Sequence, residues 1–172
     1  MDTADQVGII FPEILVPDEK VNQKKWAVIA CDQFTSYPEY WTRMSRAIGG
    51  APSSLHIIVP EAFLRNADVE QDIAHAKETM QRYLEDGVLV KLPAGAVLVE
   101  RKTPYGTRIG LVVAVDLECY DLDPDSKPLI RATEQTVLER IPPRQQVREQ
   151  AAIELAHVLL LVDDVNDTLL GP

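Results

Sequence analysis

Positive charge is scarce in this sequence. Lysine and arginine together number 17 against 27 aspartates and glutamates, so the formal net charge at pH 7 is −10. Proteins that bind the phosphate backbone of a nucleic acid, or an anionic membrane surface, need a basic patch for that contact. The overall balance therefore argues against both nucleic acid and a membrane surface as partners.

Cysteine and long apolar runs are rare as well. The chain contains only Cys31 and Cys119, and no stretch approaches the ~18 consecutive apolar residues of a transmembrane helix. The first six residues, MDTADQ, are acidic, and no apolar core of a signal peptide follows them. Together these absences predict a reduced, cytoplasmic protein.

Motifs of familiar chemistry are missing. The histidines, His56, His75 and His157, lie far apart in the chain, and no Cys or His pair has the spacing of metal ligands, so no metal site is predicted. G-x-S-x-G, Walker A and G-x-G-x-x-G patterns do not occur. Cys31 has no histidine close in sequence, and we interpret it as a small core residue in preference to a nucleophile.

What is present fits one globular domain. The 172 residues are 46% hydrophobic and 26% charged, which is ordinary globular composition and enough chain for a core without disulfides. Apolar residues at helical spacing predict helices from about Pro38 to Ile48 and from Asp68 to Gly87. Ser36 or Thr35 is expected to cap the first of these.

Short apolar runs predict the strands. Residues 26–31 and 157–162 look buried, as inner strands are, and residues 55–59 predict a further strand that Pro60 closes. Residues 96–103 and 107–116, on either side of a Pro-Tyr-Gly turn, predict an antiparallel hairpin. We expect an α/β or α+β fold, in which a mixed sheet of about four to five strands packs with about three helices.

One stretch, residues 129–148, reverses the acidic trend. Its charged residues are the arginines Arg131, Arg140, Arg144 and Arg148 and the glutamates Glu134 and Glu139. Thr136 and Glu139 fit a capping box, and Thr133 is a competing N-cap, so a short helix is predicted to begin between residues 132 and 136. The Pro142-Pro143 pair is predicted to end that helix by Ile141.

The arginines of this stretch allow two interpretations. They can pair with Glu134 or Glu139 and form a solvated ion-pair surface, as most charge clusters do. They can instead form an anion site, because a planar guanidinium suits carboxylate and phosphate and the free N–H groups of a helix start add to it.

A second candidate site, Asp32, Thr35 and Ser36, follows the predicted strand at 26–31. Ligands of open α/β sheets gather at the C-terminal ends of strands. Asp32 can hold a metal-bound phosphate or act as a base, and Thr35 and Ser36 can donate to an anion. The alternative is that Asp32 and Ser36 only build a turn and a helix cap. If both sites are real, Asp32 and the helix start at Thr133 should line one cleft.

Three motifs together carry a resemblance. The segments WAVIACDQFTSYPEYW, PSSLHIIVPE and IRATEQTVLERIPPRQQVRE closely resemble the bacterial family known as domain of unknown function 1015, and the resemblance covers residues 11–164. Members of that family are typically more than twice as long, so the resemblance implies that residues 1–172, a single domain by their length, are the N-terminal portion of a longer protein.

The resemblance also implies an activity, though not its residues. Full-length members carry a downstream D-G-H/N-H/S-type motif, similar to one in the ParB/sulfiredoxin-like small-molecule kinases, which phosphorylate free serine with a nucleotide. That motif is absent from this chain. No catalytic residue is carried over, but these candidates lie in the family's motifs: Asp32, Thr35, Arg131, Thr133, Glu134, Thr136, Arg140 and Arg144.

Two hypotheses follow. In the first, the domain is the anion- and nucleotide-binding half of a small-molecule phosphotransferase-like enzyme. Asp32 or Glu134 serves there as metal ligand or base, and the nucleotide comes with Mg²⁺. The anion-binding residues are Thr35, Ser36, Arg131, Thr133, Thr136, Arg140 and Arg144. Its partners are a small phosphorylated ligand and the remainder of its own chain. In the second, the chain is a non-catalytic interaction or regulatory domain, whose arginine–glutamate surface meets another domain or a second copy.

Overall fold

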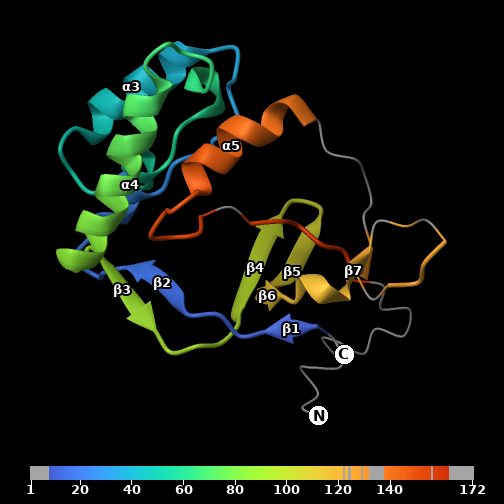
Figure 1. Cartoon of the computed structure of the whole chain (residues 1–172). Coiled ribbons are helices and arrows are strands. Elements are labelled where there is room, and N and C mark those ends of the chain that lie inside the picture. The colour runs from blue at the N-terminus through green and yellow to red at the C-terminus, as the bar shows by residue number, and fades with distance from the viewer. Residues whose placement is uncertain are drawn as a thin grey trace.

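The computed structural model describes residues 8–121, 123, 125–128, 130–131, 138–155 and 157–162, with Arg140 described by its backbone alone. The fold is of the mixed α/β class that the sequence predicts. The helices gather in one region and the short strands in another (Figure 1). No helix of the described residues has the length and apolar character needed to cross a membrane.

Two of the predicted helices are confirmed. Helix α3 (Pro38–Ile48) begins with its proline, at a position where a missing N–H leaves no hydrogen bond unmade. Helix α4 (Val69–Glu85) begins after Asp68. Gly49 and Gly87 follow the two helices with φ of 61° and 66°, a left-handed conformation that glycine adopts without steric strain.

The core lies around α4. Its central side chain, Met80, packs with Ile57 and Tyr83, and a neighbouring cluster joins Ile73 of α4 to Val59. Removing an aliphatic side chain of this size from water contributes about 1.5–3 kcal/mol. The remaining buried hydrophobic residues among those described are Trp41, Ile48, Ala76 and Leu89.

The strands pair two by two. The antiparallel pairs are β1 (Ile9–Ile10) with β6 (Ala114–Val115), β2 (Ile14–Pro17) with β3 (Leu89–Leu92), and β4 (Val97–Thr103) with β5 (Gly106–Val112). The short β7 (Tyr120–Asp121) and β8 (Ile130–Arg131) run parallel. The predicted hairpin is confirmed as β4–β5, with Val97 opposite Val112 and Thr103 opposite Gly106. Over the described residues the strands form separate two-stranded sheets and no single continuous one.

Three strand predictions are wrong, those at residues 26–31, 55–59 and 157–162. Helix α2 (Gln23–Trp26), capped by the Asn22 side chain, occupies the start of the first run, and residues 27–31 pair with no strand. Residues 54–57 form the 3₁₀ helix η1 (Ser54–Ile57), because Ser53 accepts a hydrogen bond from the Leu55 N–H. Residues 157–162 are unpaired and exposed. A short apolar run carries no period that separates a strand from these alternatives.

The double proline also acts differently from its prediction. Helix α5 (Ile141–Arg148) begins at the residue where a helix was predicted to end, directly after the 3₁₀ helix η4 (Leu138–Arg140). Pro142 and Pro143 lie in the first turn of α5, where N–H groups have no partner within the helix and a fixed φ is favourable. The predicted helix start at residues 132–136 lies outside the described residues. The two further 3₁₀ helices are η2 (Glu61–Phe63) and η3 (Leu117–Cys119).

Candidate anion-binding site

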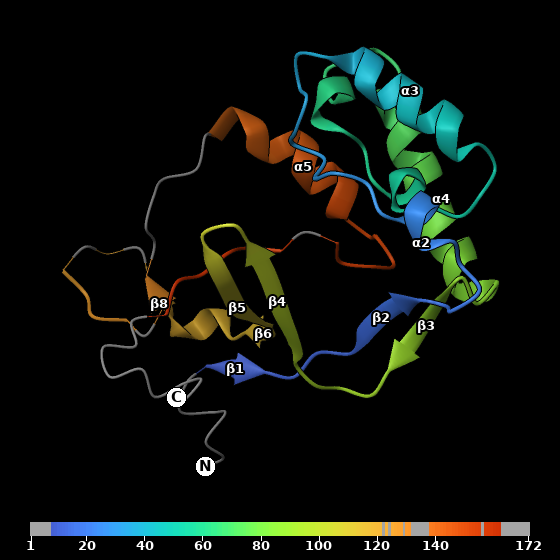
Figure 2. The same cartoon turned by 180° about the vertical axis from the view of Figure 1, so that it is seen from behind.

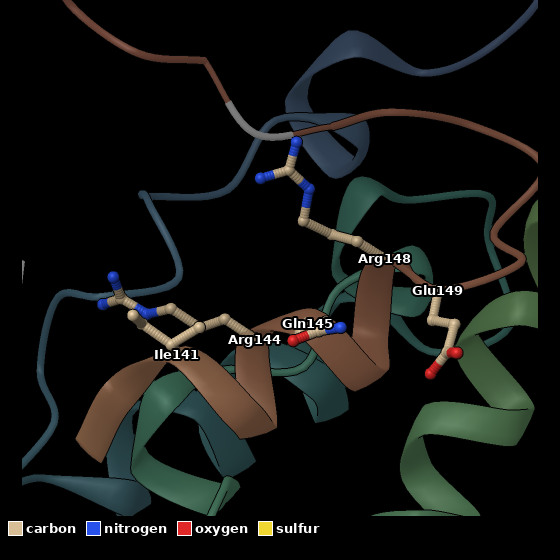
Figure 3. Close-up of a pocket in the computed structure, with 5 residues that line it drawn as sticks. All are labelled: Ile141, Arg144, Gln145, Arg148 and Glu149. Carbon is tan, nitrogen blue, oxygen red and sulfur yellow. The ribbon is translucent and has the colours of Figure 1, made fainter. Parts of the chain in front are cut away.

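Helix α5 presents two arginines one turn apart. Arg144 and Arg148 stand at i and i+4 and therefore on one face of the helix. Their guanidinium groups extend to the same side of α5, whereas Glu149 points to the other (Figure 3). With Ile141 and Gln145, these residues line an open pocket of about 510 Å³. The pocket thus brings two exposed positive charges together on an acidic protein.

Each of these arginines has a carboxylate partner. Arg144 Nη2 lies 2.9 Å from Glu61 Oε2. The Nε and Nη2 atoms of Arg148 both donate to Glu154 Oε2, at 2.9 and 2.6 Å. Both guanidinium groups are about half exposed, so each pair contributes about 0–1 kcal/mol to stability. A guanidinium carries five N–H donors. The bonds to the two carboxylates use one donor of Arg144 and two donors of Arg148.

Glu61 connects α5 to the polar turn at residues 31–36. Its backbone N–H donates to the carbonyl oxygen of Cys31 at 2.8 Å, and its side chain holds Arg144. Asp32, Thr35 and Ser36 are all exposed in this turn. Glu61 therefore contacts both the candidate turn and one candidate arginine. That arginine, Arg144, lies 83 residues further along the chain than Glu61.

The turn is conformationally strained at Phe34. Its φ is +52°, which a bulky side chain rarely adopts and which costs on the order of 1–3 kcal/mol. The Phe34 ring stacks on Tyr40 of α3, with the centroids 4.2 Å apart. That stacking offsets part of the strain and holds the turn against α3. Tyr37 is the N-cap of α3 and no side chain caps it, so the predicted caps Thr35 and Ser36 are wrong.

Cys31 is exposed, which contradicts its interpretation as a core residue. The pKa of its thiol is raised, first by partial burial of the sulfur and then by the Asp32 carboxylate; Arg144 is among the groups that oppose the rise. A raised pKa keeps the thiol protonated at neutral pH, and the thiol is then a weak nucleophile. The influence of Arg144 on Cys31 agrees with the link through Glu61.

Of the other predicted arginines, Arg131 does not lie at α5. Arg131 lies in β8, where its Nε donates to the Pro128 carbonyl oxygen at 3.4 Å, and β8 is well separated from α5 (Figure 2). Arg140 ends η4, and its side chain is outside the described part of the chain. Thr133, Glu134 and Thr136 lie outside it as well, so the cleft predicted between Asp32 and Thr133 stays a prediction.

Two residues of this site were absent from the predicted set. The sequence places Arg148 in the basic stretch, but the double proline predicts a helix stop, and a stop there removes the i, i+4 relation between Arg144 and Arg148. Glu61 gave no signal, because its role depends on contacts made far along the chain. In the part of the chain that the structure describes, no three His, Cys, Asp or Glu side chains are grouped closely enough to hold a metal ion.

These features define a mixed α/β domain with a two-arginine pocket on a short helix. The sequence model of the family described as "Protein of unknown function (DUF1015)" matches residues 11–171. Because the match covers nearly the whole chain, the protein belongs to this family. No curated protein and no solved structure matches the chain.

Proposed function

We propose that this domain binds a small phosphorylated ligand at the α5 pocket, and that it serves as the anion- and nucleotide-binding half of a small-molecule phosphotransferase-like enzyme. The observation that carries the proposal is the pair Arg144 and Arg148, on one face of α5 and lining one pocket. Guanidinium groups bind phosphate through parallel N–H···O bonds and stabilise the charge of a transferring phosphoryl group.

The ion pairs of the pocket fit this role. Glu61 and Glu154 hold the arginines in place, so little side-chain entropy is lost when an anion binds. Within the described residues, the hydrogen bonds of both arginines leave further N–H donors, and with the Gln145 amide these can donate to phosphate oxygens. Asp32, on the turn that Glu61 joins to Arg144, is the carboxylate we assign to a Mg²⁺ ion carried by a nucleotide.

The second candidate is a non-catalytic interaction or regulatory domain. The observation that favours it is the same pair of salt bridges, Arg144–Glu61 and Arg148–Glu154, because arginines already paired with carboxylates are also typical of a solvated or partner-facing surface. Under this alternative the α5 face meets another domain or a second copy of the chain, and phosphate ligands have no preferred place on it.

Calorimetric titration with ATP and ADP, with and without Mg²⁺, tests the proposal. We expect saturable binding to the wild-type chain and a loss on the order of tenfold in affinity for Arg148→Ala. Arg43→Ala is the matched control, because Arg43 is an exposed arginine of α3 and does not line the α5 pocket.

Two outcomes speak against the phosphate site. One is the absence of binding by the wild-type chain, and the other is equal affinity of the Arg148→Ala and Arg43→Ala variants. A concentration-dependent dimer that the charge reversal Arg144→Glu dissociates, measured by size-exclusion chromatography with light scattering, supports the interaction domain instead.

A further inference from the structure

The β4–β5 hairpin places two like charges next to each other. Arg101 of β4 lies directly opposite Arg108 of β5, and both residues are exposed. Residues opposite each other in an antiparallel pair share one face of the sheet, with their Cβ atoms about 4.5–5.5 Å apart. Neither arginine forms a salt bridge with any described residue. This face of the hairpin therefore favours an acidic group from elsewhere.

The other face of the hairpin is apolar. Leu98 lies opposite Leu111, and Ile109 is two residues from Leu111, so these three side chains share that face. Leu98 is 62% exposed, Leu111 51% and Ile109 48%. The charged residues on this face, Glu100 and Lys102, form a salt bridge with each other. The face therefore favours aliphatic side chains, because exposed apolar groups are stabilised when they leave water.

The outer edge of β5 has no strand beside it. The two strands of the hairpin lie side by side (Figure 1), and within the described residues they form a sheet of two strands only. In that part of the chain, residues 106–112 make no backbone–backbone hydrogen bond outside the hairpin. A strand edge with unpaired N–H and C=O groups can pair with another extended chain.

Gly110 leaves space for such a chain beside Arg108. It is two residues from Arg108 and therefore lies on the arginine face. A Cβ atom at this position would meet no other atom of the described residues within 4 Å. Its φ is not positive, so the backbone conformation does not require glycine. Glycine inside a strand is common where another backbone approaches closely, and we interpret Gly110 in this way.

We propose that the outer edge of β5 binds an extended segment of a partner protein in which acidic and aliphatic residues alternate. Successive side chains of a strand point to opposite faces. An added strand of this kind therefore directs its acidic residues to the arginine face and its aliphatic residues to the apolar face. The edge of β5 fits better than that of β4, because β4 contributes the Glu100 carboxylate to the apolar face. The edge shares no residue with the α5 pocket.

The amide signals of β5 provide a direct test. The probe is an eight-residue peptide that alternates aspartate and valine, with both ends capped, and it is titrated into the ¹⁵N-labelled chain. We expect saturable shifts of the amide signals of residues 106–112. One control peptide alternates lysine and valine, which reverses the charge. The other places all its aspartates before its valines, which removes the alternation. Both controls should bind at least tenfold more weakly than the probe.

A pair of variants tests the role of the arginine face. Arg108→Gln should weaken binding of the aspartate–valine peptide on the order of tenfold. Arg43→Gln changes an exposed arginine of α3 and should leave the affinity unchanged. Because Arg108→Gln removes a contact between like charges, it should not destabilise the hairpin.

Four results overturn the inference. The first is that the aspartate–valine peptide shifts no β5 amide signal saturably. The second is that either control peptide binds as tightly as the probe. The third is equal affinity of the Arg108→Gln and Arg43→Gln variants for the probe. The fourth is a dimer of the chain alone, seen by sedimentation velocity and dissociated by Arg108→Gln, because the edge would then bind a second copy.

Discussion

The helical region and the strand region of this protein bury their apolar residues to very different degrees. In the helical region, Met80 of α4 and Trp41 of α3 are each 1% exposed. In the strand region, Leu98 of β4 is 62% exposed, and Leu159, in the segment that follows α5, is 88% exposed. Most of the stabilisation by apolar burial in the described residues therefore comes from α3, α4 and the segments packed on them.

The two regions also differ in how their polar groups are paired. Around α4, the Tyr83 hydroxyl lies 3.0 Å from both the Ser53 backbone N–H nitrogen and His56 Nδ1. On the hairpin, Arg101 stands directly opposite Arg108, and like charges opposite each other across two strands destabilise the pair. Local hydrogen-bonded structure thus supports the helical region, while the hairpin forms mainly through its backbone bonds.

Deletion of one apolar side chain in each region should give the largest contrast. Met80→Ala removes a fully buried side chain and leaves a cavity, so we expect it to lower the free energy of unfolding by about 2–5 kcal/mol. Leu159→Ala removes an exposed one and should change it by less than about 0.5 kcal/mol. Urea unfolding followed by circular dichroism measures both. Equal losses would show that the contrast between the two regions is mistaken.

A smaller contrast is expected for two tyrosine hydroxyls. Tyr83→Phe leaves the Ser53 N–H and His56 Nδ1 without their partner in a buried setting, and we expect a loss of about 1–3 kcal/mol. Tyr105 is fully exposed in the hairpin turn, so Tyr105→Phe should have no measurable effect. The same urea titrations separate the two variants. If Tyr83→Phe is as stable as the wild type, the hydrogen bonds of the Tyr83 hydroxyl do not stabilise the fold.

The smallest effect is the pH dependence that His56 introduces. Burial, followed by the charges of His75 and Arg82, lowers the pKa of His56 below its usual 6.5. The unfolded chain therefore takes up this proton first as the pH falls. The contribution of neutral His56 to the free energy of unfolding is present above about pH 6.5 and is lost as the pH falls through the lowered pKa. Unfolding midpoints of the wild type and His56→Gln between pH 7 and pH 5 should converge on acidification. A difference between the two midpoints that stays constant across this range would contradict the prediction.

The comparison also explains which features the sequence could predict. Helices α3 and α4 follow from local signals in the sequence. These are the first-turn proline of α3, Asp68 before α4, apolar residues at helical spacing, and a glycine after the C-terminal end of each helix. The β4–β5 hairpin follows from its Pro-Tyr-Gly turn. Residues 26–31 and 157–162 were predicted wrongly because pairing of a strand depends on partners elsewhere in the chain, which an apolar run does not specify.

The candidate site was predictable only in part. The basic composition of residues 129–148 pointed to Arg144, and the cluster at residues 31–36 pointed to Asp32. The contact that relates them, through Glu61, is a tertiary one. Pro142 and Pro143 are compatible with a helix start as well as with a helix stop, and no local pattern distinguishes the two.

The central claim is that Arg144 and Arg148 are held by carboxylates that a phosphate ligand replaces or shares. Its most direct test is the calorimetric affinity of Glu61→Gln for pyrophosphate, because this change removes the carboxylate beside Arg144 and retains the shape of the side chain. We predict an affinity several-fold higher than that of the wild-type chain, as expected when about 1 kcal/mol of competition is removed. An unchanged or lower affinity of Glu61→Gln, or no pyrophosphate binding by either chain, would contradict the claim.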